Sequence, residues 1–202
     1  NTMTGGNISN IIVKYPHIES KNSHAYYNNN IIYLKDRTYG TPDIHYYWET
    51  ILHEYGHHIS NCYGFDEHPG GDHFLYNHID ELAKNKDLST SKINGVKLAW
   101  SEGWAHYFSF VTINYYNDLY ENGGLTNPVI PNYDNLYTRK NIETQTDLGT
   151  GIIWSLGEGS ELAVAMFLYD MADDSGTEET FDCISLGFIN LWNLINSGNK
   201  AK

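Results

Sequence analysis

The chain contains the pentapeptide His53-Glu54-Tyr55-Gly56-His57, an H-E-x-x-H motif. In an α-helix, residues four apart lie on one face, so both imidazoles can bind one metal ion. Glu54 projects about 100° away from His53 and can reach a water molecule on that ion. Because so short a motif also arises by chance, its meaning depends on whether the surrounding residues form a helix.

The residues around the motif predict such a helix over about 43–61. Thr41, Pro42 and Asp43 form a helix start signal, with proline at the first helical position, and Gly64 is a stop signal. Apolar side chains recur at helical spacing on the side opposite the two histidines, at Ile44, Trp48, Ile51, Tyr55 and Ile59. We therefore expect one face of this helix in the core and the other facing a cleft.

A second helix, expected over about 97–120, carries a candidate third ligand. The segment S-E-G-W-A-H begins there at Ser101, and Glu102 lies opposite an apolar stripe. That stripe consists of Trp100, Trp104, Phe108, Val111 and Tyr115. A catalytic zinc site needs three protein ligands and an open position, so we predict one zinc ion per chain, held by His53, His57 and Glu102. The alternative is a solvated Glu102 on an amphipathic helix.

The 202 residues are expected to form one α+β domain, because no internal repeat, low-complexity tract or proline-rich linker divides them. Residues 1–42 are expected to be a strand-rich part, and residues 43–202 a mainly helical part that contains the site. The sequence also predicts strands at 8–15 and 31–35 and two further helices at 159–172 and 178–196. Two long loops are expected at 64–95 and 121–150.

Charge and composition exclude several kinds of partner. Twelve Lys and Arg against 25 Asp and Glu give a formal charge of -13, which disfavours nucleic acid. No apolar run approaches the 18 or so residues of a membrane-spanning helix, so we expect no such segment. Two cysteines, Cys62 and Cys183, are too few for a cysteine-based zinc site. Many Asn and Tyr residues favour a secreted or cell-surface protein, although residues 1–10 show no signal-peptide pattern.

The two helix motifs together resemble the gluzincin metallopeptidases, the thermolysin-like and aminopeptidase-type zinc enzymes whose third ligand is a glutamate on the next active-site helix. The glutamate motif is similar to their N-E-G-F-A, with Ser101 in place of Asn and a longer gap after His57. The chain also resembles bacterial secreted metalloprotease-like proteins with an H-E-Y-G-H motif, a Gly-Gly-x-His loop and an E-x-x-V-A-x-x-L-x-D-x-x-D helix. Residues 69–73 and 161–173 match these last two motifs, so the resemblance spans about residues 30–175.

This resemblance implies a zincin-like fold and zinc-dependent hydrolysis of peptide bonds in a peptide or protein substrate. Glu54 is then the general base that takes a proton from the metal-activated water. His73 is the first candidate for the donor that stabilises the oxyanion, because Gly70 and Gly71 let its loop approach closely. Tyr133 and Tyr137 are further candidates. By the same analogy, the strand over Ile31 to Leu34 is an edge strand that holds the substrate main chain.

Other polar residues have alternative interpretations. Glu161 heads an apolar stripe and is expected in the interior, where it could support a ligand histidine, bind a substrate amine, replace Glu102 or form a salt bridge. His106 follows Glu102 by one turn and could support the site or contact substrate. His58 is expected at the polar surface or at the lip of the cleft. A second ion could bind the loop acids and histidines at Asp66, Glu67, His68, Asp72, His73 and His78, although solvated loop histidines are commoner.

Three other functions compete with peptide hydrolysis. A cell-surface binding module could keep the metal for structure, but a purely structural site does not need Glu54. An interaction protein without metal would leave the histidines at the surface. A zinc amidase for a non-peptide amide would use the same residues, because the same activated water attacks both kinds of bond.

Overall fold

A computed structural model of the chain describes residues 8–17, 25–35, 48–69, 88–121, 140–141, 146–147, 158–172 and 186–199. Within these ranges the protein is a small, mostly helical α+β structure. Its strands are β1 (Ile12–His17), β2 (Ala25–Asn28), β3 (Ile31–Lys35), β4 (Lys140–Asn141) and β5 (Thr146–Asp147). Its helices are α1 (Trp48–Tyr63), α3 (Leu88–Glu121), α4 (Glu161–Ala172) and α5 (Gly187–Asn199).

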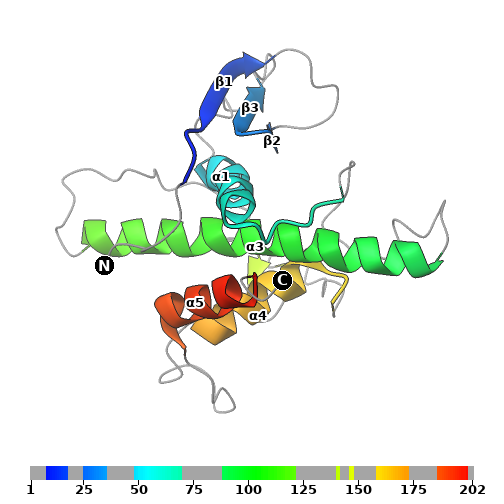
Figure 1. Cartoon of the computed structure of the whole chain (residues 1–202). Helices are drawn as coiled ribbons and strands as arrows, with labels where there is room; N and C mark the ends of the chain where they lie inside the picture. The colour runs from blue at the N-terminus through cyan, green and yellow to red at the C-terminus, as the bar shows by residue number, and fades with distance from the viewer. Residues whose placement is uncertain are drawn as a thin grey trace.

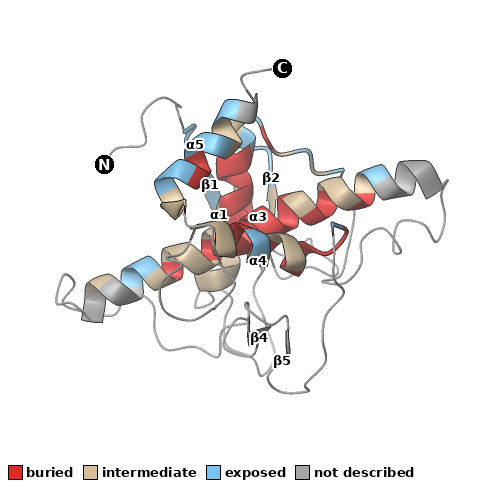
Figure 2. Cartoon of the chain, turned by 90° about the horizontal axis from the view of Figure 1, so that it is seen from below, coloured by how far each residue is buried: buried red, intermediate tan, exposed pale blue. Residues whose placement is uncertain are grey.

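The elements form successive layers around the long helix α3. Strands β1, β2 and β3 lie above α1, α1 lies against the middle of α3, and α4 and α5 lie on the opposite side of α3 (Figure 1). Buried residues concentrate in α1 and in the central part of α3 (Figure 2). Helix α1 is therefore packed on two sides, against the sheet and against α3.

The three-stranded sheet has the order β1-β3-β2. Strands β2 and β3 pair antiparallel through a two-residue turn at Asn29 and Asn30, whose φ angles are 48° and 62°. Asparagine tolerates this left-handed region, which explains the turn in the asparagine run. Strand β1 runs parallel to β3, with Ile12 opposite Ile31. The strand predicted over 31–35 is confirmed, the first strand begins later than predicted, and β2 was not predicted.

Strand β3 occupies the centre of this sheet, between β1 and β2. The expectation that Ile31 to Leu34 form an edge strand open to a substrate is therefore wrong, because both edges of β3 are already paired. Ile32 and Leu34 are buried and pack toward Ile51 and Tyr55 of α1. The central strand thus anchors the helix that carries the H-E-x-x-H motif.

Helix α1 ends in a Schellman motif at Gly64. The Phe65 amide donates to the Ser60 carbonyl at 3.1 Å and the Gly64 amide to the Asn61 carbonyl at 3.1 Å. Gly64 has φ +75°, which a residue without Cβ adopts at no steric cost. The predicted stop is confirmed, and the chain turns back across the end of α1.

At two glycines of the sequence motifs, neighbouring helices approach each other closely. A Cβ on Gly56 would lie 2.9 Å from the Cα of Ala105, and the Trp104 indole donates to the Gly56 carbonyl at 3.0 Å. A Cβ on Gly103 would lie 2.6 Å from the Cβ of Val164 in α4. Helix α3 is therefore held closely on both sides at the level of Glu102.

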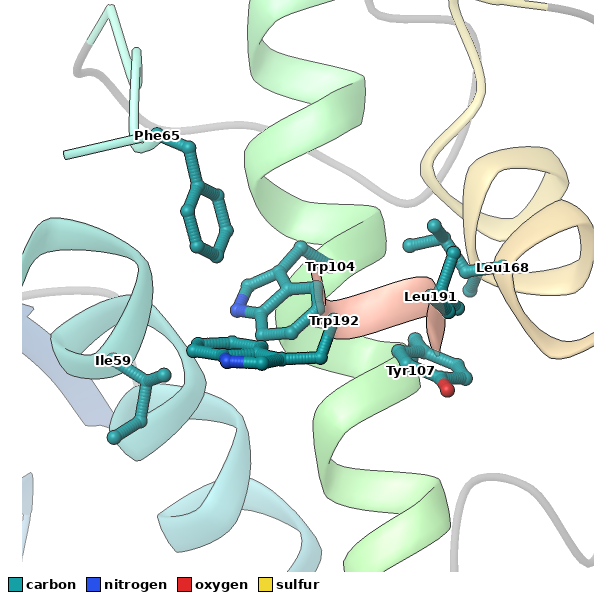
Figure 3. Packing of buried hydrophobic residues seen from close by; sticks show 8 residues of the cluster. Ile59, Phe65, Trp104, Tyr107, Leu168, Leu191 and Trp192 are labelled. Atoms are coloured by element: carbon teal, nitrogen blue, oxygen red, sulfur yellow. The ribbon is translucent and has the colours of Figure 1, made fainter. Parts of the chain in front are cut away.

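The main core fills the space beside this crossing. Trp104 and Trp192 lie at its centre, with Tyr107 and Leu191 next to them and Phe65 approaching from the end of α1 (Figure 3). Phe65 and Trp104 meet edge to face, with ring centroids 5.0 Å apart. Buried aromatic rings of this size contribute much of the apolar burial in a domain of this length. They fix α1 relative to α3.

Several predicted boundaries differ from the structure. Helix α3 begins at Leu88, inside the predicted loop 64–95, because a long packed helix tolerates its Asn94 and Gly95. Helix α5 spans Gly187–Asn199 rather than 178–196, whereas α4 agrees with its prediction. The predicted start of the first helix at Asp43 lies outside the described residues. No helix among the described ranges is both long and apolar enough to cross a bilayer.

Candidate metal centre

Three predicted ligands converge between α1 and α3. His53 Nε2 lies 3.0 Å from Glu102 Oε2, His57 Nε2 lies 3.3 Å from the same oxygen, and the two Nε2 atoms are 3.3 Å apart. Ligands at the Zn–N and Zn–O distances of a tetrahedral site are about 3.3 Å from one another. The spacing of the three donor atoms therefore fits a small tetrahedral cation.

The helix crossing explains why these residues meet. His53 and His57 are one turn apart on α1, with Gly56 between them at the contact with α3. Glu102 lies one turn before Ala105, which is the residue that Gly56 touches. Since no side chain separates the helices at that contact, the two imidazoles reach the carboxylate directly.

Burial and charge give the two histidines opposite protonation behaviour. Burial, followed by the neighbouring His106, lowers the pKa of His53 to about 4. Burial also disfavours the charged form of His57, but the charge and hydrogen bond of Glu102 and the charges of two further carboxylates outweigh it and raise its pKa to about 9. Burial opposes ionisation of Glu102 as well, yet His57 and the histidine hydrogen bonds hold its pKa well below the usual range. The ligand set therefore pairs a buried carboxylate with positive charge.

Glu54 lies next to the ligands on α1. Its side chain is buried, and its charge is one of the causes that raise the pKa of His57. The carboxylate predicted as general base is thus inside the site and outside the converging ligand set.

A third histidine joins the centre from the turn after α1. His68 Nε2 lies 2.9 Å from Glu102 Oε1, the carboxylate oxygen that does not face His53 and His57. Because an ionised carboxylate only accepts hydrogen bonds, the His68 N–H donates. The side chains of His53 and His68 keep 15% and 26% of their surface exposed, against 4% for Glu102. Solvent therefore reaches the centre on the side of these two histidines.

A hydrogen-bonded chain supports His57 from behind. The Ser101 hydroxyl donates to Asp66 Oδ1 at 2.7 Å, and Ser101 Oγ lies 3.3 Å from His57 Nδ1. Since the hydroxyl hydrogen points to Asp66, its oxygen accepts the His57 Nδ1–H, which leaves Nε2 facing the ligand cluster. His53 differs, because its buried Nδ1 has no hydrogen-bond partner among the described residues.

Glu161 and His106 lie behind His53 and form a buried pair. His106 Nε2 is 3.0 Å from Glu161 Oε1, and the His106 ring centroid is 4.4 Å from that of His53. Of the roles predicted for Glu161, the structure shows the salt bridge or hydrogen bond, and its partner is His106. Both residues are buried as predicted, and His106 supports His53 through ring packing.

His58 is not at the surface, which corrects the sequence prediction. Its side chain is fully buried, with Nε2 2.9 Å from the Ser9 carbonyl and Nδ1 3.3 Å from the Tyr27 hydroxyl. The physical reason is that α1 lies between the sheet and α3, so its side away from the metal ligands faces β2 instead of water. His58 joins the motif helix to the N-terminal strands.

The donor predicted to stabilise an oxyanion lies outside the described residues. This holds for His73 and for the further candidates Tyr133 and Tyr137. Of the loop residues predicted as a second ion site, Asp66 and His68 instead contact residues of the first centre. The sequence contained one signal for the position of His68, which is the aspartate two residues before it. Asp66 forms an Asx-turn in which its Oδ1 accepts the His68 amide at 3.1 Å.

Comparison of the chain with protein-family models, with curated proteins and with solved structures finds no match.

Proposed function

We propose that this chain is a zinc-dependent hydrolase that cleaves peptide bonds and has a zincin-like catalytic fold. The observation that carries the proposal is the convergence of His53, His57 and Glu102, whose donor atoms are 3.0 to 3.3 Å apart. Two imidazoles and one carboxylate are a ligand set that zinc prefers at a catalytic site with an open position. Glu54, buried beside these ligands, supplies the acid–base group.

The metal ion and the residues of the centre have different roles in the proposed reaction. Zinc, when bound, acidifies a water molecule and polarises the carbonyl of the scissile bond. Glu54 accepts the proton of that water and delivers it to the leaving amine. Substrate approaches on the side where His53 and His68 are exposed, since Glu102 is covered. The Glu161–His106 pair packs against the rear of His53.

Two features favour a catalytic over a structural metal. Structural zinc sites are closed by four protein ligands, whereas the converging set among the described residues has three. Glu54 is buried beside the ligands, and a purely structural metal site does not need a base in that place. Hydrolysis of a non-peptide amide uses the same groups, so the substrate test must include both kinds of amide.

The proposal is tested by metal analysis followed by a substrate screen. Protein purified without an affinity tag is expected to contain about one zinc per chain by elemental analysis. The loaded protein is then incubated with a diverse peptide library and with small non-peptide amides, and new termini or amines are detected by mass spectrometry. Cleavage that disappears with a chelator and returns with zinc supports the proposal. Stoichiometric zinc without cleavage of any peptide would contradict it.

A further inference from the structure

One aspartate in the turn after α1 is connected to two of the three proposed ligands, in each case through an intermediate residue. Asp66 Oδ1 accepts the Ser101 hydroxyl at 2.7 Å and also the backbone amide of His68 at 3.1 Å. Ser101 in turn contacts His57, and the His68 side chain contacts Glu102. Two hydrogen-bonded routes into the centre therefore begin at the same carboxylate oxygen. The first route runs through Ser101 to His57, and the second runs through His68 to Glu102.

The first route fixes the tautomer and orientation of His57. The Ser101 side chain is buried, so its hydroxyl has few alternative partners, and the bond to Asp66 directs its hydrogen away from His57. The Ser101 oxygen then accepts from His57 Nδ1. An imidazole whose other nitrogen is hydrogen-bonded in this way keeps a fixed ring plane and a more basic donor atom.

The second route fixes the carboxylate of Glu102. His68 holds Oε1, while Oε2 faces His53 and His57. With one oxygen engaged by His68, Glu102 presents a single oxygen to a cation. A monodentate carboxylate preserves the open coordination position that a catalytic zinc requires.

We propose that Asp66, Ser101 and His68 are positioning residues of the metal centre: Asp66 orients His57 through Ser101, and His68 keeps Glu102 monodentate. This inference rests on the proposed zinc site but not on the identity of the substrate. Loss of such supporting hydrogen bonds is expected to weaken metal binding by about 10- to 100-fold.

The test measures zinc affinity of the full chain by competition with a chromogenic chelator. Asp66→Ala is compared with Glu67→Ala, which removes the same charge from the same turn. Alanine is used because an asparagine Oδ1 at position 66 would still accept both hydrogen bonds. Glu67 pairs with Lys97 at 2.9 Å in an exposed position, so Glu67→Ala leaves both routes intact. Asp66→Ala is expected to weaken zinc binding about tenfold and Glu67→Ala less than twofold. Ser101→Ala is expected to weaken it to a similar extent as Asp66→Ala.

The second route is tested with cobalt as a spectroscopic substitute for zinc. The visible bands of Co²⁺ weaken as its coordination number rises from four to five, so they report whether the carboxylate binds through one oxygen or two. His68→Phe is expected to weaken these bands, and His68→Gln, which keeps an N–H donor, is expected to restore them. Ser101→Ala should leave band intensity unchanged because it acts on an imidazole.

The outcomes separate this inference from the proposed function. If the unmodified chain binds zinc and Asp66→Ala, Ser101→Ala and Glu67→Ala bind it equally well, the positioning role is overturned but the metal centre is not. No zinc binding by the unmodified chain would overturn the metal centre itself. If Ser101→Ala does not fold, as judged by circular dichroism, the matched pair Asp66→Ala and Glu67→Ala decides the first route.

Discussion

Gly56 of α1 and Ala105 of α3 are in direct backbone contact: a Cβ on Gly56 would stand 2.9 Å from the Ala105 Cα and 3.3 Å from its carbonyl oxygen. This contact sets the distance between the helices on which the ligands lie. It brings His57 within 3.3 Å of Glu102, although the two residues belong to different helices. The glycine of the H-E-Y-G-H motif thus has a structural task of its own.

Gly56→Ala is therefore expected to damage both the fold and the metal centre. The added methyl group meets backbone atoms that cannot move away alone, and overpacking of this kind costs about 1–3 kcal/mol, partly offset by the better helix propensity of alanine. Urea unfolding of the metal-free protein should show the loss, and zinc affinity should fall with it. Asn193→Ala, on the exposed face of α5, is the control, with an expected change within about 0.5 kcal/mol. Unchanged stability in Gly56→Ala would mean that the helices are not in contact there.

Zinc uptake is expected to release about one proton per ion at pH 7. The pKa of His57 is raised to about 9, so the metal-free protein carries a proton there that zinc must displace, whereas the pKa of His53 is lowered to about 4 and its ring is already neutral. Affinity should accordingly increase about tenfold for each pH unit between roughly 5 and 8. Calorimetry in buffers of different ionisation enthalpy measures the proton count directly. A count of zero at pH 7 would show that His57 is neutral before zinc binds.

Glu54→Gln is expected to keep zinc and lose hydrolysis by about 10²- to 10⁴-fold, because the amide cannot accept the proton of the water. His57→Ala should lose both, since it removes a ligand. Zinc content and cleavage of the best substrate from the library screen are measured on the same preparations. Full activity in Glu54→Gln would disprove the proposed role of this carboxylate.

Glu102→Ala and Glu161→Ala distinguish the two buried glutamates. Glu102→Ala is expected to lose zinc, since its Oε2 is one of the three converging atoms. Glu161→Ala should keep zinc and lower the free energy of unfolding by roughly 1.5–3 kcal/mol, because it removes the carboxylate that faces buried His106. Elemental analysis and urea unfolding are measured for both variants. The reverse pattern would make Glu161 the third ligand.

The ligand set could be predicted from the sequence because it follows from helical periodicity. His53 and His57 share a face at any helix position, and the aromatic stripe of the second helix leaves Glu102 on its other side. The asparagine turn before β3 and the glycine that ends α1 also follow from local backbone preferences. These features depend on residues within a few positions of one another.

The supporting residues could not be predicted in the same way. His68 contacts Glu102 across 34 residues and Ser101 contacts Asp66 across 35. Each contact depends on the direction in which the chain leaves the Schellman motif and on the spacing between α1 and α3. Neither quantity is contained in the periodicity of one segment.

Local periodicity is enough to predict that two histidines and a glutamate lie on helix faces opposite apolar stripes, since it fixes which side chains share a face. The place of β3 inside its sheet, the burial of His58 and the approach of Asp66 and His68 to the centre depend on tertiary packing. The physical reason is that α1 is packed on two sides. A helix between a sheet and another helix buries polar residues that a one-sided amphipathic pattern assigns to water, and their hydrogen bonds depend on neighbours distant in the chain.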